Sequence, residues 1–185
     1  MGRITEGIKH LLIINVLLFV ATYLLGEQLF GWLALWYPQN PNFGIWQVVS
    51  HMFMHGGIAH ILFNMYALWA FGSPLERMWG TRKFLFFYFS AGLGAALIHT
   101  GWNYYQVSQG LEALAAAGIP ETQVIDALLQ GKYSPAWMEV APRKVVQSMM
   151  DSFMIPAVGA SGAIYGILVA FGMLFPNSEL FLIFL

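Results

Sequence analysis

Charged residues are scarce in this sequence. Only 9% of the 185 residues are Asp, Glu, Lys or Arg, whereas soluble domains average about 25%. Eight basic and nine acidic residues are too few to cover a water-soluble body of this size, and a net charge of −1 offers no basic surface for nucleic acid. Together with the 58% share of hydrophobic residues, this composition argues against a soluble enzyme, a disordered chain and a nucleic-acid-binding protein. It predicts a protein of the lipid bilayer.

Cysteine is absent altogether. The chain therefore has no disulfide framework, no thiolate metal site and no cysteine nucleophile. The absence leaves the redox compartment undecided.

Long runs of apolar residues predict several membrane-spanning helices. A helix needs about 20 apolar residues to cross a bilayer core about 30 Å thick, and four stretches predict spans at about residues 8–25, 52–72, 84–102 and 153–176. A fifth span starts at 180 and stops after six apolar residues, so the sequence either ends unusually or is a longer protein cut within its fifth helix. The first stretch resembles a secretory signal but lacks a small-residue cleavage site, and we interpret it as a retained anchor. We expect one all-α, polytopic membrane domain over residues 1–185.

Basic residues indicate the orientation of the predicted spans. They lie before the first span and between the second and third, at Arg3, Lys9, Arg77, Arg82 and Lys83. The positive-inside rule places both segments, and hence the N-terminus, in the cytoplasm. We expect a multi-pass protein of a bacterial inner membrane, with residues 26–50 and 103–152 on the outer face.

Residues 103–152 differ from the rest of the chain in composition. This stretch holds five acidic and three basic residues, with helix-stop signals at Gly118, Pro120 and Gly131. We expect two or three short amphipathic helices that form an ordered insertion on the outer face. Its sequence gives no indication of a role.

The fourth predicted span contains the motif Gly159-Ala160-Ser161-Gly162. A helix from Ser161 to Phe175 would be about 22 Å long, shorter than the bilayer core. The preceding residues include Pro156 and Gly159, and irregular backbone at membrane depth survives only when it is buried in protein or lines a water-filled cavity. Ser161 is then expected at a helix N-terminus beside water, where free N–H groups can stabilise an oxyanion. Close helix packing by small residues is the alternative explanation of the motif.

Histidines and an asparagine gather at the start of the second predicted span. Four-residue spacing puts His60 and Asn64 on one helical face, where both could donate hydrogen bonds to developing negative charge. Hydrogen bonds between helices are the alternative role. His51 and His55 also share a face, but no nearby carboxylate or His-Glu-x-x-His pattern accompanies them, so we expect neither a metal nor a cofactor.

Together these segments resemble the rhomboid family of intramembrane serine proteases. The likeness rests on residues 46–72 with His51, His55, His60 and Asn64, on the loop with Glu76-Arg77, Gly80 and Arg82, and on Gly159-Ala160-Ser161-Gly162 followed by Tyr165. Gly-x-Ser-Gly alone is a weak signal, but its order relative to the His-x-x-x-Asn helix makes the combination specific.

The resemblance implies a role for each matching residue. Ser161 would be the nucleophile, His60, Asn64 and the Ser161 N–H would stabilise the oxyanion, and Tyr165 would support the general-base histidine. In this family that histidine belongs to a sixth helix, and all five histidines of this sequence precede Ser161. A second departure is Gln47, where many members have arginine, which raises the question of how the first outer loop is anchored.

The implied activity is that of a serine endopeptidase that cleaves membrane-anchored proteins near the outer membrane face. The expected partners are therefore membrane-anchored substrates and the lipid bilayer, without nucleic acid. One alternative is a non-catalytic rhomboid-like protein that binds or escorts client transmembrane helices, which the absent base would favour. A channel or transporter is disfavoured because the predicted spans lack charged residues, apart from Lys9 at the edge of the first.

Overall fold

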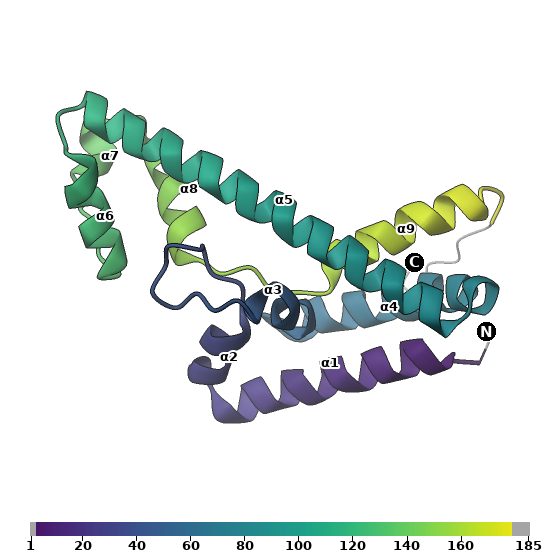
Figure 1. Cartoon of the computed structure of the whole chain (residues 1–185). Helices are drawn as coiled ribbons and strands as arrows, with labels where there is room; N and C mark the ends of the chain where they lie inside the picture. The colour runs from purple at the N-terminus through teal and green to yellow at the C-terminus, as the bar shows by residue number, and fades with distance from the viewer. Residues whose placement is uncertain (1–2, 179–185) are drawn as a thin grey trace.

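The computed structural model describes residues 3–178, and within them the only strand-like pairing is an isolated antiparallel bridge between Leu35 and Ala157. The all-α prediction is confirmed. The expected start of a fifth span at residue 180 lies outside the described residues. In chain order (Figure 1), the helices are α1 (Glu6–Leu25), α2 (Glu27–Leu33), α3 (Gln47–Ser50), the 3-10 turn η1 (His51–Phe53), α4 (Ile58–Trp79), α5 (Thr81–Ala116), α6 (Glu121–Leu129), α7 (Trp137–Val140), α8 (Arg143–Met154) and α9 (Ser161–Leu174).

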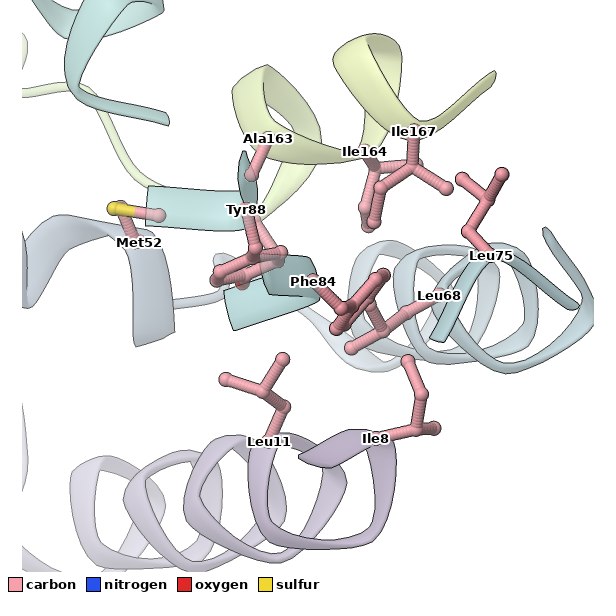
Figure 2. Packing of buried hydrophobic residues seen from close by; sticks show 11 residues of the cluster. Ile8, Leu11, Met52, Leu68, Leu75, Phe84, Tyr88, Ala163, Ile164 and Ile167 are labelled. Atoms are coloured by element: carbon pink, nitrogen blue, oxygen red, sulfur yellow. The ribbon is translucent and has the colours of Figure 1, made fainter. Parts of the chain in front are cut away.

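Four helices form the apolar bundle. α4 packs against α1, α5 and α9, and α5 also packs against α9. Figure 2 shows side chains from all four helices meeting in one core, with Ile8 from α1, Leu68 from α4, Phe84 from α5 and Ile164 from α9. Among the described helices, α1, α4 and α5 are long and apolar enough to cross a membrane, whereas the 14 residues of α9 span only about 21 Å.

The second span differs from the expected range 52–72. α4 begins at Ile58, because residues 51–53 form a 3-10 turn and Gly56 and Gly57 follow before the helix. It continues through Pro74 to Trp79 and ends at Gly80, whose φ of 79° favours glycine.

The third span is longer than the expected range 84–102. α5 has 36 residues, or about 54 Å, and therefore extends well beyond a bilayer core about 30 Å thick. No proline interrupts it, and it ends shortly before Gly118, which has a φ of 85°, and Pro120.

Residues 103–154, which we call the 103–154 subdomain, pack along this extension. The end of α5 and the helices α6, α7 and α8 bury a second apolar core that includes Leu114, Val124, Trp137 and Met149. Gly110 lets α8 approach closely, because a Cβ at this position would stand 2.4 Å from the Cβ of Met149. The subdomain returns the chain to α9, and α8 ends at Met154, so residues 153 and 154 of the expected fourth span belong to α8.

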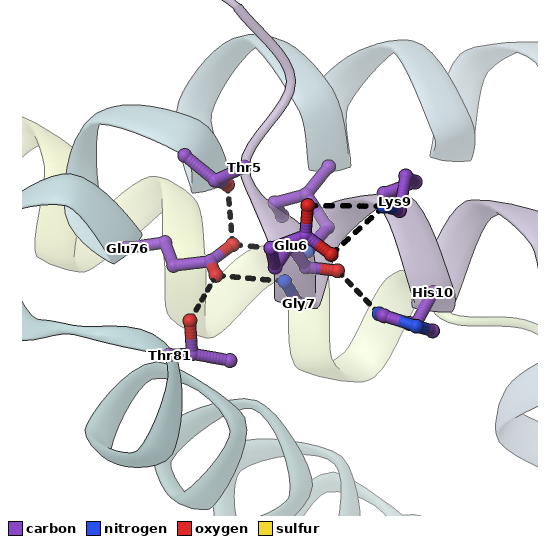
Figure 3. A network of polar contacts seen from close by, with 8 residues as sticks. Thr5, Glu6, Gly7, Lys9, His10, Glu76 and Thr81 are labelled. Carbon is purple, nitrogen blue, oxygen red and sulfur yellow. Dashed lines mark hydrogen bonds and ion pairs between the residues drawn. The ribbon is translucent and has the colours of Figure 1, made fainter.

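One buried carboxylate joins three helices at the end of the bundle opposite Ser161. Glu76 is only 3% exposed, and its carboxylate accepts hydrogen bonds from the Gly7 N–H at 2.7 Å, the Ile8 N–H at 2.9 Å and the Thr81 hydroxyl at 2.6 Å, as well as from the Thr5 hydroxyl. Figure 3 shows this carboxylate between α1 and the start of α5. It satisfies two N–H groups of the first turn of α1, which have no partner within the helix.

We predict that Glu76→Ala lowers the free energy of unfolding by about 3 kcal/mol, because it leaves several buried donors without an acceptor. Thermal unfolding of the purified protein in detergent measures the effect. Glu112→Gln, at an exposed position on α5, is the matched control and should leave the transition unchanged. Equal transitions for the Glu76→Ala variant and the unaltered protein would contradict the assignment.

Candidate functional site

The segment before Ser161 is not helical, and its backbone is paired with the preceding loop. Ala157 and Leu35 exchange two hydrogen bonds, with N–O distances of 2.8 and 2.9 Å. The Gly159 N–H donates to the carbonyl oxygen of His51 at 2.9 Å. Both backbone groups of Ala157 and the N–H of Gly159 therefore have partners although no helix contains these residues, as membrane depth requires.

Ser161 is the first residue of α9 and lies at a defined depth in the bundle. A Cβ on Gly162 would stand 2.6 Å from the Ala95 side chain, and one on Gly166 would stand 2.7 Å from that of Ala91, so the start of α9 lies against α5 near Ala95. Trp102 follows Ala95 by seven residues, or about 10 Å along α5. Ser161 thus lies about 10 Å along α5 from the position at which this helix exposes Trp102.

His60 and Ser161 meet around Gly159. The point where a Cβ would stand on Gly159 lies 2.8 Å from His60 Nε2 and 3.5 Å from Ser161 Oγ. Gly159 has a φ of 121°, a conformation that side-chain-bearing residues rarely adopt. Both the backbone conformation and the space next to it therefore require glycine, and its missing side chain leaves room between the imidazole and the hydroxyl.

The hydrogen bonding of His60 makes Nε2 a donor. The Gly56 N–H donates to His60 Nδ1 over 3.4 Å, a long contact in which Nδ1 is the acceptor, so the ring proton is assigned to Nε2. Nε2 is the atom that lies near Gly159 and Ser161. The imidazole can thus donate a hydrogen bond to a group that forms beside Ser161 Oγ.

Asn64 is buried one helical turn after His60. It is 7% exposed, and its Nδ2 has no hydrogen-bond partner among residues 3–178. A buried amide donor without a partner carries a desolvation cost of about 1–3 kcal/mol. An unpartnered donor on the same helical face as His60 can stabilise an oxygen atom that develops negative charge.

His51 and His55 are buried near His60, but their surroundings differ from that of His60. His51 Nδ1 lies 2.8 Å from the Gln47 carbonyl oxygen, and its burial lowers the pKa of the imidazole against the opposing effect of that bond. Burial, and to a smaller extent the neighbouring His60 ring at 5.0 Å, lowers the pKa of His55 to about 4. Both rings are therefore neutral near pH 7, and residues 3–178 contain no cluster of three or more potential metal ligands.

Tyr165 lies one turn after Ser161 on α9. Its side chain is 70% exposed, so no described element covers it. Residues four apart share a helical face, and the exposed ring therefore stands on the Ser161 side of α9. The structure thus brings His60 and Ser161 together, puts Asn64 on the same face of α4 as His60, and leaves Tyr165 open beside them.

Gln47 anchors the loop between α2 and α3, at the position where many members of the family have arginine. Its side chain is fully buried, and its Nε2 donates to the carbonyl oxygens of Trp32 at 3.1 Å and Asn42 at 2.8 Å, while its Oε1 accepts from the Trp36 N–H at 3.3 Å. The loop between α2 and α3 is thus anchored by an amide. Sequence analysis identified Gln47 only as a departure from a pattern, since an amide carries no sign of the carbonyl groups that it will meet.

Comparison with known proteins finds a protein family that matches part of this chain. Residues 42–121 match the family model of the Rhomboid domain, which confirms the resemblance drawn from the motifs. The matched residues include His60 and Asn64 but not Ser161. Together with the apolar helices, the match identifies an integral membrane protein.

Similar curated proteins are bacterial rhomboid proteases. The chain is 40% identical over 52 residues to "Rhomboid protease GluP" of Bacillus subtilis, which covers 28% of this chain and 10% of that protein. It is 38% identical over 74 residues to "Rhomboid protease GlpG" of Klebsiella pneumoniae, covering 40% and 27%, and 38% identical over 63 residues to "Rhomboid protease AarA" of Providencia stuartii, covering 34% and 22%. The aligned part thus spans little more than a quarter of these relatives at most.

The burial of His55 predicts a pH dependence of stability. Its pKa of about 4 in the folded state lies below the value of about 6.5 in the unfolded chain, so the unfolded state binds more protons between these values. The stabilisation is complete above pH 6.5 and is lost as the pH falls toward 4, by up to about 3 kcal/mol. Unfolding of the unaltered protein and of His55→Asn should be followed across this range. An equal slope in both proteins would contradict the prediction.

We further predict that Gly159→Ala lowers the free energy of unfolding by about 2 kcal/mol, because the backbone conformation is strained for alanine and the methyl group meets His60. Denaturant unfolding gives the value. Gly94→Ala is the control, since a Cβ on Gly94 has no neighbour within 4 Å. A stability loss that is no larger for Gly159→Ala than for Gly94→Ala would refute the strain argument.

Proposed function

We propose that the protein acts as an intramembrane serine endopeptidase with Ser161 as its nucleophile. The observation that carries the proposal is the meeting of Ser161 Oγ and His60 Nε2 around Gly159. The buried, unbonded Asn64 Nδ2 one turn further along α4 supports it. The match of residues 42–121 to the Rhomboid domain and the similarity to rhomboid proteases agree with a protease of this kind.

The reaction is acyl transfer. Ser161 Oγ attacks the carbonyl carbon of a substrate peptide bond and its proton passes to a general base, while the carbonyl oxygen becomes an oxyanion. The His60 Nε2–H, the Asn64 amide and the Ser161 N–H donate to that oxyanion. The amine then leaves with a proton, and water hydrolyses the acyl ester.

The general base is not assigned to a residue of this chain. The family resemblance implies a histidine supported by Tyr165, whose exposed ring is compatible with stacking on a further group. His51 and His55 are buried among neighbouring residues of the chain, and both precede Ser161, so neither is a candidate for the implied position.

The proposed substrates are membrane-anchored proteins. Ser161 lies about 10 Å along α5 from the exposed Trp102, and we expect a substrate bond to enter the upper part of the bilayer to reach it. We propose that this end of the bundle faces outward and that the N-terminus is cytoplasmic, in a bacterial inner membrane, because the exposed basic residues Arg77, Arg82 and Lys83 lie at the opposite end.

The test is cleavage of a membrane-anchored reporter by membranes that contain the protein. Ser161→Ala should abolish cleavage, and Asn64→Ala should lower kcat about 100-fold with a smaller change in KM, since its bond strengthens in the transition state. Ser152→Ala, a half-buried serine of α8, should leave cleavage unchanged.

Two results would contradict the proposal. Cleavage that persists in Ser161→Ala would remove the nucleophile. If the unaltered protein co-purifies with the reporter and leaves it intact, the non-catalytic client-binding alternative is favoured instead.

A further inference from the structure

A cavity of about 450 Å³ is lined by residues around the passage from α1 to α2. Figure 1 shows the chain turning there from α1 into α2. Residues from the end of α1, from α2 and from the segment that leads into α4 line it. They are Phe19, Thr22, Tyr23, Gly26, Glu27, Phe30, His55, Gly56, Gly57 and Ile58. The cavity is separate from the space around Gly159, but His55 and Gly56 connect the two, because both contact His60.

The surroundings of this cavity are those of the membrane surface. α1 has 20 residues, or about 30 Å, so its last turn reaches the end of the bilayer core. Tyr23 and Leu24 in that turn are 83% and 74% exposed, and Ile58 across the cavity is 69% exposed. The lining is mostly apolar, which suits an acyl chain better than a water-soluble ligand.

Charge selects the headgroup. Glu27 is exposed and is the only acidic side chain in the lining, which contains no Lys or Arg. Among residues 3–178 Glu27 makes no hydrogen bond or ion pair, so its carboxylate is available to a ligand. An anionic headgroup would find no cationic partner here, whereas a primary ammonium can donate directly to the carboxylate.

We propose that this cavity binds a phospholipid with a primary ammonium headgroup, phosphatidylethanolamine, from the leaflet at the Ser161 end of the bundle. The ammonium bonds to Glu27, and an acyl chain lies against Phe19, Phe30 and Ile58. A bound lipid restrains residues 55–58, and the Gly56 N–H then stays in place to orient His60. This last consequence rests on the proposed function, whereas lipid binding itself does not.

Native mass spectrometry of the full chain tests the binding. The detergent-solubilised protein is mixed with equal amounts of phosphatidylethanolamine, phosphatidylcholine and phosphatidylglycerol that carry the same acyl chains. We expect preferential retention of phosphatidylethanolamine, and a roughly threefold loss of this preference in Glu27→Gln, in line with a partly exposed charge pair. Glu27 is exposed, so the variant should fold. Glu112→Gln is the matched control and should retain the preference.

Equal retention of the three lipids, or an unchanged preference in Glu27→Gln, would overturn the proposal, because either result describes lipid that surrounds the protein without a site. Amide hydrogen exchange at residues 55–58 tests the consequence for His60, and it should slow with phosphatidylethanolamine but not with phosphatidylglycerol. These readouts do not require Ser161 to react. If the protein selects phosphatidylethanolamine but Ser161 is inert, the proposed protease is refuted and the lipid site is supported. If Ser161 reacts but the protein does not select this lipid, the lipid site is refuted and the proposed protease is supported.

Discussion

Backbone N–H and C=O groups at membrane depth need hydrogen-bond partners, and this requirement shapes the segment between α8 and α9. Ile155 and Ala160 still bond to α8 and α9, but the residues between them lie outside any helix, and the pairs Leu35–Ala157 and His51–Gly159 supply hydrogen bonds there. These pairs let α9 start inside the bundle rather than at its surface. Without them the chain would have to continue as helix from α8, and Ser161 would no longer occupy a helix N-terminus beside His60.

The loop that supplies one of these partners is itself held by side chains. Gln47 bonds to two backbone groups of the loop and to one of α2. Asn40 Nδ2 donates to the Phe153 carbonyl oxygen at 2.8 Å, which joins the loop to the end of α8. The ring of Tyr37 also lies 5.3 Å from that of Phe153. The loop and the 103–154 subdomain therefore fix the segment before Ser161 from two sides, so residues far from the site in sequence determine its geometry.

Local sequence signals predicted part of this arrangement. Apolar runs and four-residue spacing were sufficient to predict an all-α membrane domain and to put His60 and Asn64 on one helical face, because both depend only on helical geometry. The boundaries of α4 and the length of α5 were not predicted, since apolar content does not reveal that a helix begins after Gly57 or continues out of the bilayer. The closeness of His60 and Ser161 follows from the φ of Gly159 and from packing between distant segments, which periodicity cannot indicate.

α4 links the two ends of the molecule. Glu76 fixes the last turn of α4 against α1 and α5, while His60 and Asn64 lie in its first two turns. Glu76 and His60 are about 24 Å apart along the helix axis. Packing against three helices and the bonds of the Glu76 carboxylate hold α4 in place, and with it the positions of His60 and Asn64. The short segment 55–57 sets only the finer orientation of the His60 ring. Coarse and fine positioning of the donors beside Ser161 thus come from opposite ends of one helix.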